Sequence, residues 1–216
     1  MTNDRNAALG PVRDALNVVM DPLLTGHGFA RRRNSLVYKR DIDQSQQVID
    51  FSVRRVKSRD GVPAARAGAN FSITMPGVNT IVSEMTRGNP IPILLSAPTV
   101  KGQIGLLGPK RGVQEWDIRS VESAAADLAP MAEFVREYVV PFFTEYTTAQ
   151  SITEGYERKD VRVPHYYKGL LVIAGAYVHE KKTHEARRIV DEAFGQTDGL
   201  RREYSFTLGY LAKKRA

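Results

Sequence analysis

QVIDFSVRRVK, residues 47–57, alternates between apolar and polar side chains, and this alternation decides the fold class. In an extended chain it puts Ile49, Phe51 and Val53 on one face. Residues 69–75, ANFSITM, repeat the same alternation. A period of two is typical of an antiparallel strand with one buried face. The two runs therefore predict the centre of an antiparallel sheet.

Shorter strand-like segments on both sides of these runs predict a sheet of about five strands. They are residues 35–40, 101–112 and 113–120, the last containing the single Trp116, which we expect to anchor the core. Residues 57–68, KSRDGVPAARAG, are expected to form a long loop. Residues 76–101 are rich in proline and glycine, and no regular element is assigned to them.

Helical periodicity predicts helices on either side of the sheet segments. Apolar residues recur every three or four positions in residues 8–25. A second helical region covers residues 120–146, and we expect Pro130 and Pro141 to divide it.

The end of the chain is predicted to be helical throughout. Three helices are expected, over residues 165–180, 183–195 and 199–213, with Thr183 and either Thr197 or Asp198 as N-caps. The fold class is therefore α+β: an N-terminal helix, an antiparallel sheet, packed helices and a C-terminal helical extension. Two domains are predicted, an α+β domain over residues 1–160 and the extension over residues 161–216.

Composition limits the class of protein. The 216 residues contain no cysteine, which excludes disulfides, thiolate nucleophiles and cysteine-ligated metals. The N-terminus, MTNDRNAALG, does not have the pattern of a signal peptide, and no run approaches the roughly 18 apolar residues that span a bilayer. We therefore expect a cytoplasmic protein without a membrane partner.

The net charge of +7 is distributed unevenly. Residues 27–60 and 161–216 each carry a net charge of +5, whereas residues 115–160 carry −6. Basic charge of this kind has two interpretations. It forms a surface for a polyanion, or it faces the acidic segment within the fold.

Several segments, in their order along the chain, resemble a bacterial domain-of-unknown-function family, number four-three-zero-four. They are DPLLTGHGFARRRNSLVYKR, QVIDFSVRRVKS, NFSITMPGV, IGLLGP followed by EWDI, and YVVPFFTEYTTAQSI. The resemblance covers about residues 8–155. It implies bacterial origin and an α+β fold, and it supplies neither an activity nor catalytic residues.

The C-terminal segment resembles one helical hairpin of the tetratricopeptide type. The large and small residues of that repeat correspond to Leu170, Ile173, Ala174, Tyr177, Ala186, Val190 and Ala193. About three such repeats are needed for independent stability. The sequence therefore favours an ordinary helical hairpin packed on the rest of the protein, with a true repeat as the alternative.

The candidate binding site is basic. Its residues are Arg31, Arg32, Arg33, Lys39, Arg40, Arg54, Arg55 and Lys57. If residues 35–40 and 47–57 form a hairpin, the arginine clusters lie at the same end of the sheet and could face phosphate groups. Alternatively, they are a solvated strand end, or they pair with the acidic helix around Glu133 and Glu137. The outer sheet face favours the second interpretation, because it offers no aromatic platform for stacking bases.

Motifs that carry chemistry are not found. HEKKTH, residues 179–184, is one residue longer than the zinc-protease spacing, and the step from His179 to His184 places the two rings on different helix faces. GQIGLLGPKRG lacks the Gly-Lys-Ser/Thr ending of a phosphate-binding loop and is explained by a turn. We therefore predict no catalytic residue, no cofactor and no metal.

The leading functional hypothesis is a non-enzymatic protein–protein interaction module. Its surfaces would be the proline-rich residues 76–101, which include the apolar run IPILLSAP, and the helical tail. The first alternative is a nucleic-acid-binding accessory protein that uses the basic residues. The second is an enzyme acting on a small acidic ligand.

Overall fold

The computed structural model describes residues 9–57, 63–89 and 93–214. The chain groups into two compact units, each made of segments that are distant in sequence. Unit 1 comprises residues 1–40, 47–72 and 101–144. Unit 2 comprises residues 41–46, 73–100 and 145–216, so it contains all of the predicted C-terminal extension together with a central segment of the chain.

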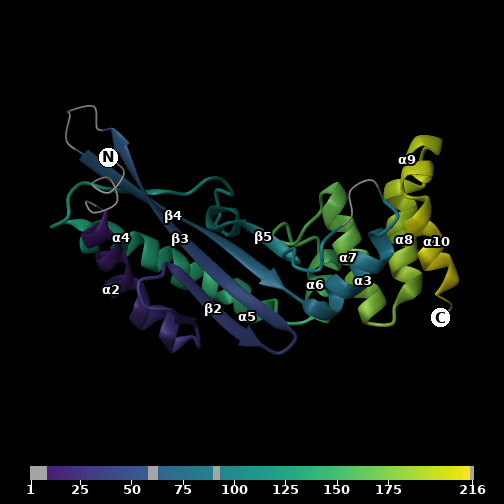
Figure 1. Ribbon diagram of the computed structural model, residues 1–216, viewed down its shortest axis with the longest axis horizontal. Helices are drawn as coiled ribbons and strands as arrows, with labels where there is room; N and C mark the ends of the chain where they lie inside the picture. Colours follow the sequence, from purple (N-terminus) through teal and green to yellow (C-terminus); the bar gives the residue numbers. More distant parts are fainter. Residues whose placement is uncertain (1–8, 58–62, 90–92, 215–216) are drawn as a thin grey trace. The chain divides into compact units, whose positions relative to one another are not determined.

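One antiparallel sheet is formed by the strands in the described ranges (Figure 1). The strands are β1 (Ala30–Arg31), β2 (Val37–Ile42), β3 (Ser45–Lys57), β4 (Pro63–Thr74), β5 (Val100–Gln103) and β6 (Trp116–Ile118). Their spatial order is β1-β2-β3-β4-β5, and β6 pairs with β4. The predicted α+β class and antiparallel sheet are confirmed.

The alternation at the centre of the sheet has the predicted effect. Ile49 and Phe51 of β3 are buried, whereas Asp50, Ser52 and Arg54 are exposed. The register between β4 and β6 places Arg66 opposite Asp117. One face of the sheet in unit 1 is therefore apolar and the other is polar and charged.

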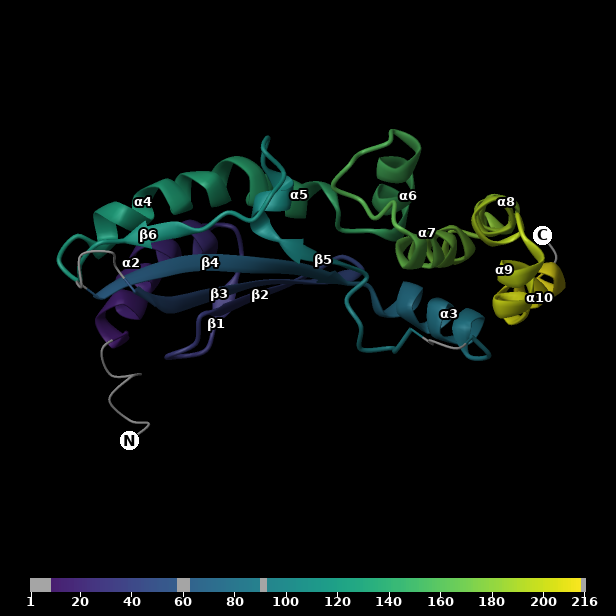
Figure 2. The ribbon, with the colours of Figure 1, turned by 90° about the horizontal axis from the view of Figure 1, so that it is seen from above.

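Helices cover the apolar face in unit 1. They are α2 (Gly10–Gly26), α4 (Ala124–Phe134), the π-helical turn η2 (Val135–Val139) and α5 (Val140–Glu145). Figure 2 shows α4 and α5 running along one side of the sheet. Phe71 of β4 packs edge-on against Phe142, with ring centroids 5.1 Å apart. Trp116 packs against Phe134 at 5.5 Å and is buried, which confirms it as a core residue.

The long helical region is interrupted between the two prolines and not at them. Val140 N–H bonds to the carbonyl of Val135, one residue further back than in an α-helix. Pro130 lies inside α4, and Pro141 is the second residue of α5. Because Pro141 has no N–H and its ring clashes with an ordinary preceding turn, a wider π turn just before it accommodates the ring.

Two other expectations about local structure were wrong. Strand β4 begins at Pro63, inside the predicted loop of residues 57–68. There the buried Ala65 and Ala67 lie on either side of the half-buried Arg66, and such small side chains give a weak strand signal. Residues 101–112, predicted as a strand, contain β5 followed by the 3₁₀ helix η1 (Ile104–Leu107).

Helix α3 (Pro76–Thr86) lies in the segment to which no element was assigned. Proline is favoured at the first position of a helix, because its missing N–H is not needed there. The Pro76-Gly77 pair, which suggests a turn, thus starts a helix. Asn79 lies in α3, and Thr99 lies in the chain that follows this helix.

Unit 2 is helical and has α7 at its centre. It contains α3, α6 (Ala149–Glu157), α7 (Tyr167–His179), α8 (Thr183–Phe194), α9 (Asp198–Glu203) and α10 (Ser205–Lys213). Residues 171–178 of α7 are buried without interruption, because α3, α6 and α8 all pack against this helix. A Cβ atom on Gly175 would come within 2.2 Å of Cγ2 of Val82, so α7 and α3 approach closely at this glycine.

The helical hairpin predicted for residues 165–195 is present as α7 and α8. Thr197 caps α9 as expected, since its side chain accepts a hydrogen bond from Leu200 N–H. Thr183 is the first residue of α8 and not its N-cap, which is Lys182. The third predicted helix is two helices, α9 and α10, which meet at Tyr204.

Candidate functional site

Arg31, the first of the predicted basic residues, is bound inside unit 1. Its Nε and Nη2 atoms donate to the two carboxylate oxygens of Asp21 at 2.6 and 2.7 Å. The buried Tyr38 donates to the same carboxylate at 2.6 Å. The hydrogen bond from Arg31 is the main reason why the pKa of Asp21 is lowered. This arginine therefore joins β1 and β2 to α2.

Arg40 is also part of the fold of unit 1. Its Nε and Nη2 atoms donate to Oε1 of Gln47 at 3.0 and 2.6 Å, and Nη1 donates to the carbonyl of His27 at 2.7 Å. The guanidinium carbon lies 4.6 Å from the centre of the Phe29 ring. Removal from water lowers the pKa of Arg40. Through the bond to His27, Arg40 fixes the segment that connects α2 to β1.

Arg54 belongs to a charge network on the polar face of the sheet. It donates to both carboxylate oxygens of Glu115, at 3.2 and 2.8 Å, and Arg66 lies 3.4 Å from the same carboxylate. Arg66 also bonds to Asp117 at 2.6 Å. The hydrogen bond from Arg54 is the largest cause of the lowered pKa of Glu115.

The acidic partners are thus not the ones that the sequence suggested. Glu133 pairs with Arg136, and Glu137 accepts a hydrogen bond from Tyr138. From the basic strand end, Arg54 pairs instead with Glu115, and Arg66 of β4 pairs with both Glu115 and Asp117, which the pairing of β6 with β4 brings beside it. Local sequence does not reveal which strand lies beside another, so this partner choice was hidden.

Four predicted cations remain accessible, namely Arg32, Arg33, Lys39 and Arg55. All are exposed, and in the ranges that the structure describes their side chains have no hydrogen bond or ion pair. Arg32 and Arg33 lie in the turn between β1 and β2, which is closed by a hydrogen bond from Ser35 N–H to the carbonyl of Arg32. The side chain of Lys57, the eighth predicted residue, lies outside the described part of the chain.

A second candidate site lies in unit 2, in the turn that contains Leu94 and Leu95. The side chains of these residues are 65% and 59% exposed. Ala97 N–H bonds to the carbonyl of Leu94 at 3.0 Å and closes the turn. Two adjacent leucines that are mostly exposed stand out, because isolated exposed apolar residues are common but exposed pairs are not.

Buried polar side chains hold this leucine turn (Leu94 to Ala97) from inside. Nδ2 of Asn79 donates to the carbonyls of Leu95 and Ala97, at 2.9 and 2.6 Å. Oδ1 of Asn79 accepts from the hydroxyl of Thr99 at 2.9 Å, and that hydroxyl accepts from Met75 N–H at 2.8 Å. Sequence reasoning missed Asn79 and Thr99, because nothing about a single asparagine in a helix reveals what it bonds to.

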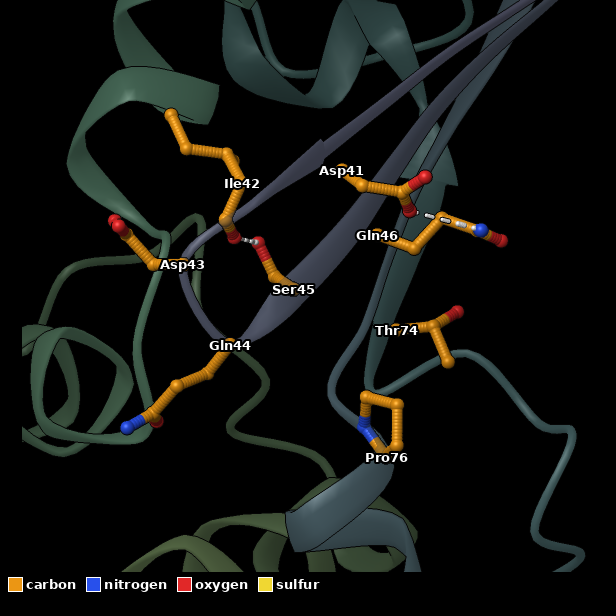
Figure 3. Close-up of a pocket in the computed structure, with 8 residues that line it drawn as sticks. All are labelled: Asp41, Ile42, Asp43, Gln44, Ser45, Gln46, Thr74 and Pro76. Atoms are coloured by element: carbon orange, nitrogen blue, oxygen red, sulfur yellow. Dashed lines mark hydrogen bonds between the residues drawn. The ribbon is translucent and has the colours of Figure 1, made fainter.

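A hollow of about 450 Å³ lies at the tip of the β2–β3 hairpin in unit 2 (Figure 3). On one side of the hairpin tip, where Thr74 also lies, Asp41 accepts a hydrogen bond from Gln46 at 3.0 Å. The side chains of Asp43 and Gln44 point to the opposite side of the hairpin tip. The eight lining residues include two aspartates and neither lysine nor arginine. This lining does not suit an acidic ligand.

The described ranges contain neither a metal-binding cluster nor a membrane-spanning helix. There, no three histidine, aspartate or glutamate side chains converge as they would around a metal ion. His179 ends α7, and His184 lies in α8, so the two belong to different helices. None of the helices in the same ranges has both the length and the apolar character needed to cross a bilayer.

The chain matches no protein-family model, no curated protein and no solved structure. The resemblance to the bacterial family of unknown function stays a prediction.

Proposed function

We propose that this protein is a non-enzymatic protein–protein interaction module and that the leucine turn is its contact point. The observation that supports the proposal is the combination of exposure and rigidity at Leu94 and Leu95. Both side chains are mostly exposed, while three hydrogen bonds involving Asn79 hold the backbone beneath them. A preorganised anchor loses little conformational entropy when it binds.

The energy available from this contact is modest. Full burial of a leucine side chain contributes about 1.5 to 3 kcal/mol. Two leucines that are already one-third buried would therefore contribute roughly 2 to 4 kcal/mol. This suffices for an anchor within a larger interface but not for a complex by itself. A partner with an apolar pocket, contacted at further points, fits this energy.

The proposal is tested by photo-crosslinking at position 94. A photoreactive phenylalanine replaces Leu94 in the full chain, and cells that naturally make the protein are irradiated. Val113, which is 81% exposed and lies in unit 1, carries the same group in the control. We expect one discrete adduct with another protein from position 94 and none from position 113.

The cross-linked partner is then purified and mixed with the unmodified chain. We expect a stoichiometric complex that the double variant Leu94→Asp, Leu95→Asp does not form. Residues 93–100 contain no charged residue, so affinity should change little with salt. Equal adducts from both positions would refute the proposal. An adduct between two copies of this chain would show that the leucine turn binds a second copy of the protein and not a different protein.

A further inference from the structure

The excess positive charge of the protein resides in unit 1. This unit has 17 Lys and Arg against 11 Asp and Glu, whereas unit 2 has 14 against 13. Several unit 1 carboxylates already pair with cations of the same unit, namely Asp21, Glu115, Asp117, Asp127 and Glu133. The exposed cations without such a partner therefore determine where an external anion would bind.

Three of these cations lie at one corner of the sheet. Phe51 N–H bonds to the carbonyl of Leu36 at 3.0 Å, which places the β1–β2 turn with Arg32 and Arg33 beside this part of β3. Because β3 continues past Phe51, Arg55 follows four residues further on, roughly 13 Å along the strand. We call Arg32, Arg33 and Arg55 the basic corner.

We infer that the basic corner binds the phosphate backbone of duplex nucleic acid. Guanidinium groups bind phosphate oxygens through paired hydrogen bonds, and these three have no competing carboxylate in the described structure. The step of roughly 13 Å along β3 from Phe51, which lies beside this turn, to Arg55 equals the axial length of a few phosphates on one strand of a duplex. The inference concerns unit 1 and is independent of the leucine turn in unit 2.

The absence of a stacking surface favours a duplex over a single strand. The exposed large apolar side chains in the described part of unit 1 are Val18, Leu106, Val113 and Val121, none of them aromatic. Proteins that bind single strands stack bases on exposed aromatic rings. A surface that offers only guanidinium groups contacts the backbone and does not read the sequence.

The number of contacts predicts the salt dependence. With three neutralised phosphates, the slope of log K against log salt concentration is about −0.9 times three, roughly −3. Affinity should therefore fall about 40-fold when the salt concentration rises fourfold, from about 50 to about 200 mM. Duplexes of different sequence should bind with the same affinity, because the contacts are to the backbone.

The experiment measures fluorescence anisotropy of a labelled mixed-sequence DNA duplex with the full chain, across that salt range. The triple variant Arg32→Glu, Arg33→Glu, Arg55→Glu should lose at least tenfold in affinity. The triple lysine variant, which keeps the charge, should stay within about threefold of the wild type. Thermal unfolding followed by circular dichroism tests whether each variant is folded. If a triple variant is unfolded, the single variant Arg33→Glu replaces it, and its affinity for the duplex should be about threefold weaker than that of the wild type.

The matched control makes the same charge change in unit 2. Its substitutions are Arg187→Glu, Arg202→Glu and Lys213→Glu, all at exposed positions, and it should bind within about twofold of the wild type. Leu94→Asp with Leu95→Asp should also leave DNA binding unchanged, which separates this inference from the proposed function. No binding at about 50 mM salt, an equal loss in the control, or tighter binding to a single strand of the same sequence would overturn the inference.

Discussion

Arg31 and Asp21 form a two-point ion pair, with Nε and Nη2 of the arginine 2.6 and 2.7 Å from the two carboxylate oxygens. In the sequence Arg31 is one of three consecutive arginines, and nothing local separates it from Arg32 and Arg33. In the structure it is a structural residue, while its two neighbours face solvent and have no side-chain partner among the residues that the structure describes. Adjacent residues of the same type thus have different roles.

This difference predicts a difference in stability between two arginine substitutions. Arg31→Ala removes both hydrogen bonds to Asp21 and should lower the free energy of unfolding by about 1 to 2 kcal/mol. Arg32→Ala, the matched control, should change it by less than about 0.5 kcal/mol. Urea denaturation of the two variants measures both values. Equal effects would mean that the ion pair does not stabilise unit 1.

Asp160 predicts a loss of stability in acid. Burial alone would raise its pKa, but hydrogen bonds from Arg162 and Tyr146 outweigh burial and lower the pKa from 3.8 to about 2. A carboxylate with a lowered pKa stabilises the folded state above pH 3.8, and this contribution is lost as the pH falls towards 2. We expect Asp160→Asn to cost about 2 kcal/mol near pH 6 and much less near pH 2.

Urea denaturation across this pH range measures the change. Asp191→Asn is the control, since that exposed carboxylate on α8 lies 3.8 Å from its nearest arginine nitrogen. It should alter the free energy of unfolding by less than about 0.5 kcal/mol at every pH. If Asp160→Asn cost the same in acid as at neutral pH, ionisation of Asp160 would not be the cause.

The buried tyrosines that donate to a carboxylate predict delayed ionisation in alkali. Tyr38, Tyr146 and Tyr177 each donate to a carboxylate, and burial followed by that bond raises the pKa of each hydroxyl above its ordinary value of 10. Their neutral forms therefore stabilise the fold up to about pH 10, and this contribution is lost as the pH rises further.

Absorbance near 295 nm during an alkaline titration measures how many of the nine tyrosines ionise in the folded state. We expect Tyr38, Tyr146 and Tyr177 to ionise only as the protein unfolds, and all nine tyrosines to ionise near pH 10 in concentrated urea. Replacing Tyr146 with phenylalanine should remove one tyrosine from the delayed group. Simultaneous ionisation of all nine in the folded protein would contradict the burial of these hydroxyls.

Two glycine-to-alanine substitutions in helices of unit 2 should have opposite effects. A Cβ at Gly175 would lie 2.2 Å from Cγ2 of Val82, so Gly175→Ala should destabilise the protein by about 1 to 3 kcal/mol. A Cβ at Gly209 in α10 meets nothing within 4 Å, so Gly209→Ala should stabilise it by up to about 1 kcal/mol. Thermal unfolding gives both signs.

The contact between α7 and α3 can be tested further with a double variant. Val82→Ala alone removes buried methyl groups, but combined with Gly175→Ala it leaves room for the new Cβ. The double variant should therefore lose less free energy of unfolding than the two single variants lose in total, and the difference should be at least about 0.5 kcal/mol. Strict additivity would show that the helices do not meet at these residues.

Sequence reasoning succeeded where a local pattern is sufficient. The alternation in residues 47–57 identified β3 and its buried face, and the periodicity of residues 165–195 identified the hairpin of α7 and α8. Thr197 was recognised as a cap from its own neighbourhood. Each inference depends only on residues within a turn or two of one another.

Sequence reasoning failed where the local pattern is weak or ambiguous and tertiary packing determines the secondary structure. Pro76-Gly77 was interpreted as part of an irregular segment and instead begins α3, which the contact with α7 at Gly175 helps to hold. The first residues of β4 are small and were assigned to a loop, yet Arg66 there pairs with Asp117 across to β6. Neighbouring elements supply the stability that these segments lack by themselves.

The sequence by itself determined the α+β class, the polar and apolar faces of the central strands, and the size and sign of the charge, because these properties follow from local periodicity and composition. Only the tertiary structure decided which cations remain accessible. Arg54 meets Glu115 from 61 residues away, and Asn79 reaches the leucine turn from the preceding helix. Electrostatic and hydrogen-bond partners depend on distance in space, which the order of residues does not specify.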